Sequence, residues 1–173
     1  YESDEHHFHA QTAASPGCVS CHMADKTYMV IDDRRDHSFR IPRPDLSVSL
    51  NTPNACNDCH ADQTAQWAAA RIQDWYAGNP PDHFAPIFAA ARRSEPAVEV
   101  AITKIAMDRS QPAIVRATAQ SLLVSYELYG SSAAIEQGLR DPHPLVRIGA
   151  LRGAQRWAAG ARWQLTKHLL EDE

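Results

Sequence analysis

The chain has 173 residues, a formal charge of −4, nine histidines and four cysteines. This length allows one domain or two small ones, and no run approaches the ~18 apolar residues of a membrane-spanning helix. The mildly acidic charge lacks the basic footprint of a nucleic-acid-binding protein. The composition also excludes collagen, coiled coils and disordered tails.

Cysteine and histidine are concentrated toward the N-terminal end of the chain. Positions 1–60 hold all four cysteines, six of the nine histidines, and five Lys or Arg against nine Asp or Glu. Positions 61–173 hold no cysteine and equal numbers of basic and acidic residues. We therefore predict a cofactor-binding domain over residues 1–61 and a helical domain over residues 62–173. Residues 1–5 are polar and unlike a secretory leader, so we expect a processed chain or a piece of a longer one.

All four cysteines fall in two copies of one motif: Cys18-Val19-Ser20-Cys21-His22 and Cys56-Asn57-Asp58-Cys59-His60. Cys-x-x-Cys-His is the attachment motif for c-type haem. Its two thiols can form thioethers to the vinyl groups of one porphyrin, and the adjacent histidine then lies under the iron. The sequence therefore predicts two covalent haem c groups, with His22 and His60 as proximal ligands.

Three other uses of paired cysteines fit the spacing less well. Zinc sites place cysteine pairs about 15–20 residues apart, whereas Cys21 and Cys56 are 35 positions apart. A thioredoxin-like pair expects a βαβ setting, which neither copy has. Disulfides between the pairs are the third alternative.

Each iron needs a second axial ligand, which tunes the site toward electron transfer or toward catalysis. The candidates in this part of the chain are four histidines: His6, His7, His9 and His37. We predict His37 as one distal ligand, because it lies in a polar stretch where a core histidine is not expected. His9 or His7 is predicted as the other, with His9 preferred. Met29 is disfavoured because we interpret residues 28–31 as a short buried apolar segment.

Arginines surround His37. We predict that one or two of Arg34, Arg35 and Arg40 bind haem propionates, because guanidinium groups pair bidentately with carboxylates. The alternative is a solvated charged loop balanced by the neighbouring aspartates. Proline at positions 42 and 44 favours an extended chain here.

The residues between the two motifs resemble those of a known family. The resemblance is carried by both motifs and by four runs: Thr27-Tyr28-Met29-Val30, Arg34-Arg35-Asp36-His37-Ser38, Ile41-Pro42-Arg43-Pro44-Asp45-Leu46-Ser47 and Thr52-Pro53-Asn54-Ala55-Cys56. They resemble bacterial multihaem c-type cytochromes of the doubled-CxxCH type with a HEAT- or TPR-like helical tail. The resemblance implies bis-histidine haems that carry electrons, an extracytoplasmic location (periplasmic or cell-surface), and other redox proteins or cytochromes as partners.

A helix is predicted over residues 63–77 from its apolar spacing. Asp62 is the predicted N-cap, and Gly78-Asn79-Pro80-Pro81 is predicted to end the helix. We expect Trp67 and Trp75 to pack in a helix–helix core, with contact to the second porphyrin as the alternative.

An internal repeat follows this helix. Val115, Arg116 and Ala119 recur 31 positions later as Val146, Arg147 and Ala150, and the preceding helix recurs at an offset of 33. This pattern resembles HEAT-like repeats that stack into a solenoid. We therefore predict a mostly α fold, with a small irregular dihaem part followed by an α-solenoid of helical hairpins. A third helix pair is predicted to begin at residues 162–170 without completing. We therefore expect either that the array is cut short or that a partner or another copy of the chain covers its open end.

These observations support three functions. The first is electron transfer by a dihaem cytochrome, and we favour it because spare histidines are available to fill both irons. The second is a haem enzyme, a reductase or peroxidase with one open iron position. The third is a subunit of a polymeric cytochrome wire, in which a histidine of one copy ligates a haem of the next.

Overall fold

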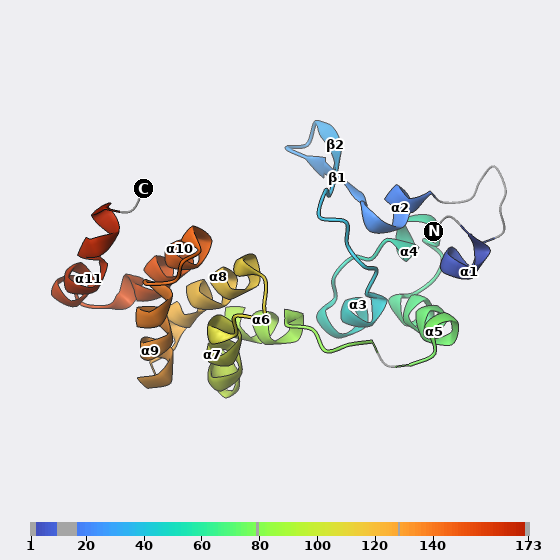
Figure 1. Ribbon diagram of the computed structural model, residues 1–173. Coiled ribbons are helices and arrows are strands. Elements are labelled where there is room, and N and C mark those ends of the chain that lie inside the picture. Colours follow the sequence, from blue (N-terminus) through green and yellow to red (C-terminus); the bar gives the residue numbers. More distant parts are fainter. Residues whose placement is uncertain (1–2, 10–16, 79, 128, 172–173) are drawn as a thin grey trace. The chain divides into compact units, whose positions relative to one another are not determined.

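The computed structural model describes residues 3–9, 17–78, 80–127 and 129–171, and it is mostly helical (Figure 1). The chain divides into two compact units, Tyr1–Asp82 (unit 1) and His83–Glu173 (unit 2). This division differs from the predicted boundary at residues 61–62, because α5 (Ala65–Tyr76) packs on α3 (Pro44–Leu50) and so belongs to unit 1. None of the helices in the described ranges is long and apolar enough to cross a bilayer.

Unit 1 consists of short helices and one hairpin, joined by irregular segments. In chain order they are α1 (Asp4–His7), α2 (Cys18–His22), β1 (Asp25–Tyr28), β2 (Asp32–Arg35), α3 (Pro44–Leu50), α4 (Cys56–Cys59) and α5 (Ala65–Tyr76). Among its described residues, only Pro44, Ser47 and Ala68 are fully buried. Side chains of the protein alone therefore give this unit almost no hydrophobic core.

Helix α5 begins two residues later than expected. The Thr64 hydroxyl accepts a hydrogen bond from the Trp67 N–H at 3.1 Å, which makes Thr64 the N-cap. The predicted N-cap, Asp62, is therefore wrong, because Thr64 satisfies one of the free N–H groups of the first turn. The helix ends at Tyr76, because Ala77 (φ 34°) and Gly78 (φ 144°) leave the helical conformation. This end agrees with the predicted stop at residues 78–81, of which Asn79 lies outside the described residues.

A two-stranded hairpin was not expected. Strands β1 and β2 pair antiparallel, with Tyr28 opposite Asp32. Met29 and Val30 both have positive φ, and the Ile31 N–H donates to the Tyr28 carbonyl at 3.2 Å, as in a type I′ turn. The interpretation of residues 28–31 as a buried segment is wrong. The tip is exposed, with Val30 93% accessible, and every residue of both strands is exposed as well.

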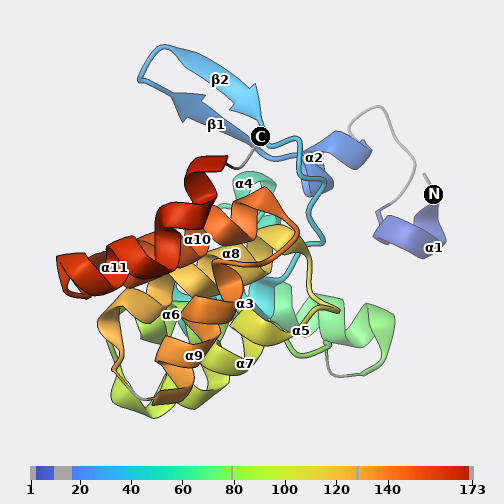
Figure 2. The ribbon, with the colours of Figure 1, turned by 60° about the vertical axis from the view of Figure 1, so that its left-hand side comes forward.

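Unit 2 is built from helices that pair with their neighbours (Figure 2). In chain order they are α6 (Ala85–Arg92), the 3₁₀ turn η1 (Pro96–Val98), α7 (Glu99–Met107), α8 (Ala113–Leu122), η2 (Leu123–Ser125), α9 (Tyr129–Gly138), α10 (Pro144–Gly153), η3 (Ala154–Arg156), α11 (Ala159–Thr166) and η4 (Lys167–Glu171). Residues 162–170, where a third helix pair is predicted to begin, lie in α11 and η4. The hydrophobic core of the described chain lies in this unit.

Helices α8 and α10 are equivalent in structure as well as in sequence. Each helix is ten residues long and continues into a 3₁₀ turn: α8 into η2 and α10 into η3. The helix and its turn therefore recur together after 31 positions. The matched residues are buried in both copies: Val115 and Val146, and Ala119 and Ala150. The periodicity in the sequence therefore reflects two helices with the same role in the core.

Glycine sets the distance between α8 and α10. A Cβ added at Gly149 would lie 2.3 Å from the Ala117 carbonyl oxygen, and one at Gly153 would lie 2.5 Å from the Gln120 carbonyl oxygen. Neither backbone oxygen can move away without breaking α8. The two helices thus approach at positions where only glycine fits.

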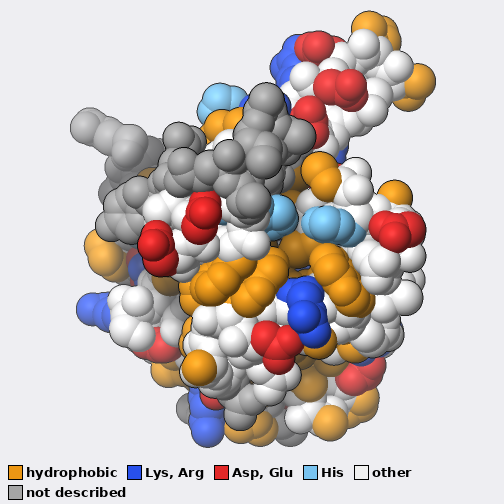
Figure 3. All heavy atoms as spheres, turned by 90° about the vertical axis from the view of Figure 1, so that its right-hand side faces the viewer, with side chains coloured by type: hydrophobic (Ala, Val, Ile, Leu, Met, Phe, Trp, Pro, Cys, Tyr) orange, Lys and Arg blue, Asp and Glu red, His pale blue; other side chains and the backbone are white. Residues whose placement is uncertain are grey.

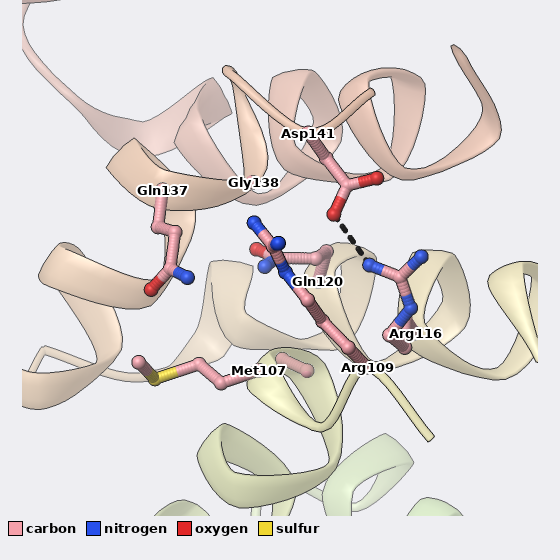
Figure 4. Close-up of a pocket in the computed structure, with 8 residues that line it drawn as sticks. Met107, Arg109, Arg116, Gln120, Gln137, Gly138 and Asp141 are labelled. Carbon is pink, nitrogen blue, oxygen red and sulfur yellow. Dashed lines mark hydrogen bonds and ion pairs between the residues drawn. The ribbon is translucent and has the colours of Figure 1, made fainter. Parts of the chain in front are cut away.

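A buried ion pair joins α8 to the turn before α10. Arg116 donates to the Asp141 carboxylate, and both side chains are about 90% buried (Figure 4). The Asp141 carboxylate also accepts from the His143 N–H at 2.9 Å. Burial raises the pKa of Asp141, but these two hydrogen bonds and the positive charges of Arg116 and Arg109 together outweigh burial and leave the pKa below its usual value.

Candidate functional site

The two Cys-x-x-Cys-His motifs form short helices that lie near one another in unit 1. All four cysteines are free thiols, none of them fully buried. Burial raises the pKa of Cys21, and negative charge on Cys59 and on Cys18 raises it further. Burial likewise raises the pKa of Cys56, with a contribution from Cys21. These directions agree with the placement of α2 and α4 close together in Figure 1.

The first motif histidine faces a second imidazole. The ring centres of His22 and His6 are 5.9 Å apart, and their planes differ by 17°. The His22 Nδ1 lies 2.7 Å from the Arg40 carbonyl oxygen. Since a carbonyl oxygen can only accept, Nδ1 carries the proton and Nε2 is left as a lone-pair donor.

The second motif histidine has the same arrangement. The ring centres of His60 and His9 are 6.1 Å apart, with 28° between their planes. The His9 Nδ1 lies 2.5 Å from the His7 carbonyl oxygen, which again assigns the proton to Nδ1 and leaves Nε2 as a lone-pair donor. Trp67 packs on His60, with ring centres 4.9 Å apart.

Both separations fit an ion held between two imidazoles. A metal–imidazole nitrogen bond is about 2 Å long, and the ring centre lies about 1 Å beyond the nitrogen. Two imidazoles on opposite sides of one metal therefore have ring centres roughly 6 Å apart. Each pair contains the histidine that follows two cysteines, so the donor set fits a haem c at each motif. Among the described residues, no group of three or more His, Cys, Asp or Glu forms a metal cluster.

Aromatic residues of α5 hold the segment that carries His6 and His9. Phe8 stacks on Trp75, with ring centres 4.9 Å apart and 8° between planes, and meets Tyr76 edge-on at 5.7 Å. Trp75 also contacts the His9 ring, and the Tyr76 hydroxyl donates to the His6 carbonyl. We call Phe8, Trp75 and Tyr76 the aromatic clamp. Histidine and hydrophobic side chains lie together on the face of the molecule in Figure 3.

The structure brings together some predicted ligands and not others. His22, His60 and His9 lie in the two pairs, and His6, a candidate that was not preferred, takes the other distal place. The His7 Nδ1 instead accepts a hydrogen bond from the His9 N–H at 3.1 Å. His37 is exposed in a turn, and no ring contact joins it to either motif histidine in the described part of the chain. Its role as a ligand stays a prediction that the geometry does not favour.

The three predicted propionate ligands have partners within the protein. Arg34 pairs with Asp32 at 2.9 Å and Arg40 with Asp36 at 2.5 Å. Arg35 donates to the carbonyls of Val19 and Met23 at the end of α2. These contacts favour the alternative of a charged loop. Hydrogen bonds from Ser38, and then from Arg40, lower the pKa of Asp36 to about 2.

Two asparagines that the sequence did not single out hold the second motif. The Asn57 side-chain amide donates to the carbonyls of His60 and Gln63 at 3.2 and 2.9 Å. Asn54 donates to the Asn57 side-chain oxygen at 2.8 Å and accepts from its N–H. Because Asn57 occupies a variable position of Cys-x-x-Cys-His, only its side-chain chemistry could have indicated this role.

No family model, curated protein or solved structure matches this chain. The function proposed below therefore rests on the residues of this chain and on their geometry.

Proposed function

We propose that the chain is a dihaem c-type cytochrome that transfers electrons. In this proposal Cys18 and Cys21 attach one haem and Cys56 and Cys59 attach the other. His6 and His22 ligate the first iron, and His9 and His60 ligate the second. The observation that carries the proposal is that each motif histidine faces a second histidine at 5.9 or 6.1 Å.

The residues around each pair favour a carrier over an enzyme. When bound, haem supplies a reversible one-electron change at its iron. His6 and His22 would hold one haem and His9 and His60 the other, and with two imidazoles at each iron neither pair would leave a place for a substrate. The carbonyls of Arg40 and His7 fix the orientation of His22 and His9 through Nδ1. Fixed ligands keep the same coordination in both oxidation states, which favours fast electron transfer.

Both distal ligands come from this chain, which favours a self-contained carrier over a polymer with shared ligands. His6 and His9 lie three positions apart on one segment, so a single clamp positions the distal ligands of both irons. The remaining parts of the proposal follow the resemblance: unit 2 as a HEAT-like solenoid that docks a partner, redox proteins or other cytochromes as that partner, and an extracytoplasmic location where haem c is attached.

Intact mass under denaturing conditions tests the proposal. The chain is produced in a host with a c-type cytochrome maturation system, and we expect the mass of the polypeptide plus two haems. A Cys56→Ala/Cys59→Ala variant should retain one haem, and a Cys18→Ala/Cys21→Ala variant should retain the other. A colourless wild-type protein of unmodified mass, or one that carries zinc, would contradict the proposal.

A further inference from the structure

Helix α10 presents a row of apolar side chains outward. Leu145, Ile148 and Leu151 are exposed, the last two at 47% and 39%. Residues three positions apart lie on one side of a helix, so these three form a single stripe. We call Leu145, Ile148 and Leu151, with the adjacent Arg152, the outer face of α10.

Helix α8 has a face at the equivalent positions of the repeat, and α10 packs on that face. Gly149 and Gly153 of α10 sit against Ala117 and Gln120 of α8. The Ser121 hydroxyl also lies 3.5 Å from the Gly149 carbonyl, to which it donates a weak hydrogen bond. Ala117, Gln120 and Ser121 are therefore the face of α8 that α10 covers.

The outer face of α10 is the repeat image of that covered face. A shift of 31 positions, which superimposes α8 and η2 on α10 and η3, takes Ala117 to Ile148, Gln120 to Leu151 and Ser121 to Arg152. Helix α10 thus offers outward the surface on which it rests itself. The image is more apolar than the original, which is the opposite of what a capping repeat with a polar outer face requires.

Charge specifies the occupant further. Residues 142–170 hold five Lys or Arg and no Asp or Glu. Arg152 is exposed beside the stripe, and Arg156 is exposed just beyond it, 3.8 Å from Glu127, which is also exposed. Such weakly paired basic groups attract acidic partners. They also disfavour a second copy of α10 as the occupant, because a symmetric contact would place arginine against arginine.

We propose that the outer face of α10 binds an acidic amphipathic helix of a partner protein, one that carries small residues at two positions four apart. The small residues take the place that Gly149 and Gly153 take on α8, and flanking carboxylates meet Arg152 and Arg156. The occupant extends the stack of α8 and α10 by one helix. This inference concerns unit 2 and does not depend on the proposed haem chemistry.

Titration of the full-length protein with a helix-stabilised synthetic peptide tests the inference. The peptide copies residues 142–157 with the three arginines changed to glutamate, so that it keeps both glycines and gains acidic flanks. Isothermal titration calorimetry should give a Kd of about 10–100 μM, in keeping with a small contact. A control peptide with leucine at both glycine positions should not bind. Raising the salt concentration should weaken binding of the first peptide.

Protein variants locate the contact. Ile148→Glu should weaken peptide binding at least tenfold, and Leu145→Glu is a second variant should the first fail to fold. Val100→Glu, at an exposed position of α7 (59% accessible), should bind as wild type does. The inference is overturned if wild type shows no binding at about 1 mM peptide, a limit of about −4 kcal/mol, or if Ile148→Glu binds as tightly as Val100→Glu. Sedimentation that shows a dimer lost in Ile148→Glu would also overturn it, since the occupant would then be a second copy.

Discussion

Replacing His6 by alanine should open one of the two irons and leave the other closed. The His6 ring is one of two imidazoles at the first motif, whereas the second motif keeps His9 and His60. We therefore expect about half of the iron to change from low-spin to high-spin in the oxidised protein. Integration of the electron paramagnetic resonance signals measures this fraction. The optical spectrum should gain a high-spin band, and cyanide should bind to about one iron per chain.

Two histidine variants serve as matched controls. His7→Ala should remain low-spin, because the His7 ring accepts a backbone hydrogen bond and faces neither motif histidine. His37→Ala should also remain low-spin, since that ring is exposed in a turn. His9→Ala should again open about half of the iron, at the second motif. The double variant His6→Ala/His9→Ala should open nearly all of it.

The controls make the reasoning refutable. If His37→Ala becomes half high-spin while His6→Ala stays low-spin, the ligand assignment from the polar stretch around His37 is right and the ring geometry is misleading. If both variants stay low-spin, neither histidine is an axial ligand, and the close pairing of the His6 and His22 rings has another cause.

Three further predictions follow from other contacts. Trp75→Ala should weaken the hold on both distal histidines by about 1–2 kcal/mol, seen as roughly tenfold tighter cyanide binding, and Trp75→Phe should restore most of the difference. Gly149→Ala should destabilise unit 2 by about 1–3 kcal/mol in thermal melts followed by circular dichroism. Gly160→Ala, whose added methyl group would meet nothing within 4 Å, should be as stable as wild type or more stable. If both variants lose the same stability, the close approach of α8 and α10 is contradicted. The depressed pKa of Asp141 stabilises the fold above the unfolded pKa of about 3.9, and this contribution is lost as the pH falls through the lower folded value. The melting temperature of Asp141→Asn should therefore fall less than that of wild type as the pH is lowered. If both melting temperatures depend on pH in the same way, the ion pair with Arg116 does not set the acid sensitivity of the fold.

The repeat in unit 2 was predictable because local sequence and packing carry the same information there. A buried position of a helix must be apolar, and helices with equal roles reuse the same pattern at a fixed period. Val115 and Val146 are 31 positions apart in the sequence, and the helices that contain them, α8 and α10, begin and end 31 positions apart as well. Unit 2 could be read from sequence since its core is made of its own side chains.

The errors concern places where the partner of a residue is distant in sequence or outside the protein. Residues 28–31 are apolar, which predicts burial, but they form the tip of a hairpin whose strand residues are all exposed. The pairing of the His6 and His22 rings could not be predicted from the residues around His6 either, because the nearby Phe8 is held by the distant helix α5. Sequence spacing contains no record of such a contact.

The described residues of unit 1 bury too few side chains to form a hydrophobic core of their own. Its described residues bury only one alanine, one proline and one serine fully, too little to offset the ordering of its backbone at about 1–2 kcal/mol for each residue. Its aromatic side chains instead gather around the two histidine pairs, where Trp67, Trp75 and Phe39 contact the imidazoles. Two porphyrins attached at these motifs would supply the missing apolar surface. In the proposed dihaem protein, the two histidine pairs would then lie inside the core of unit 1, and contacts across the unit would position them.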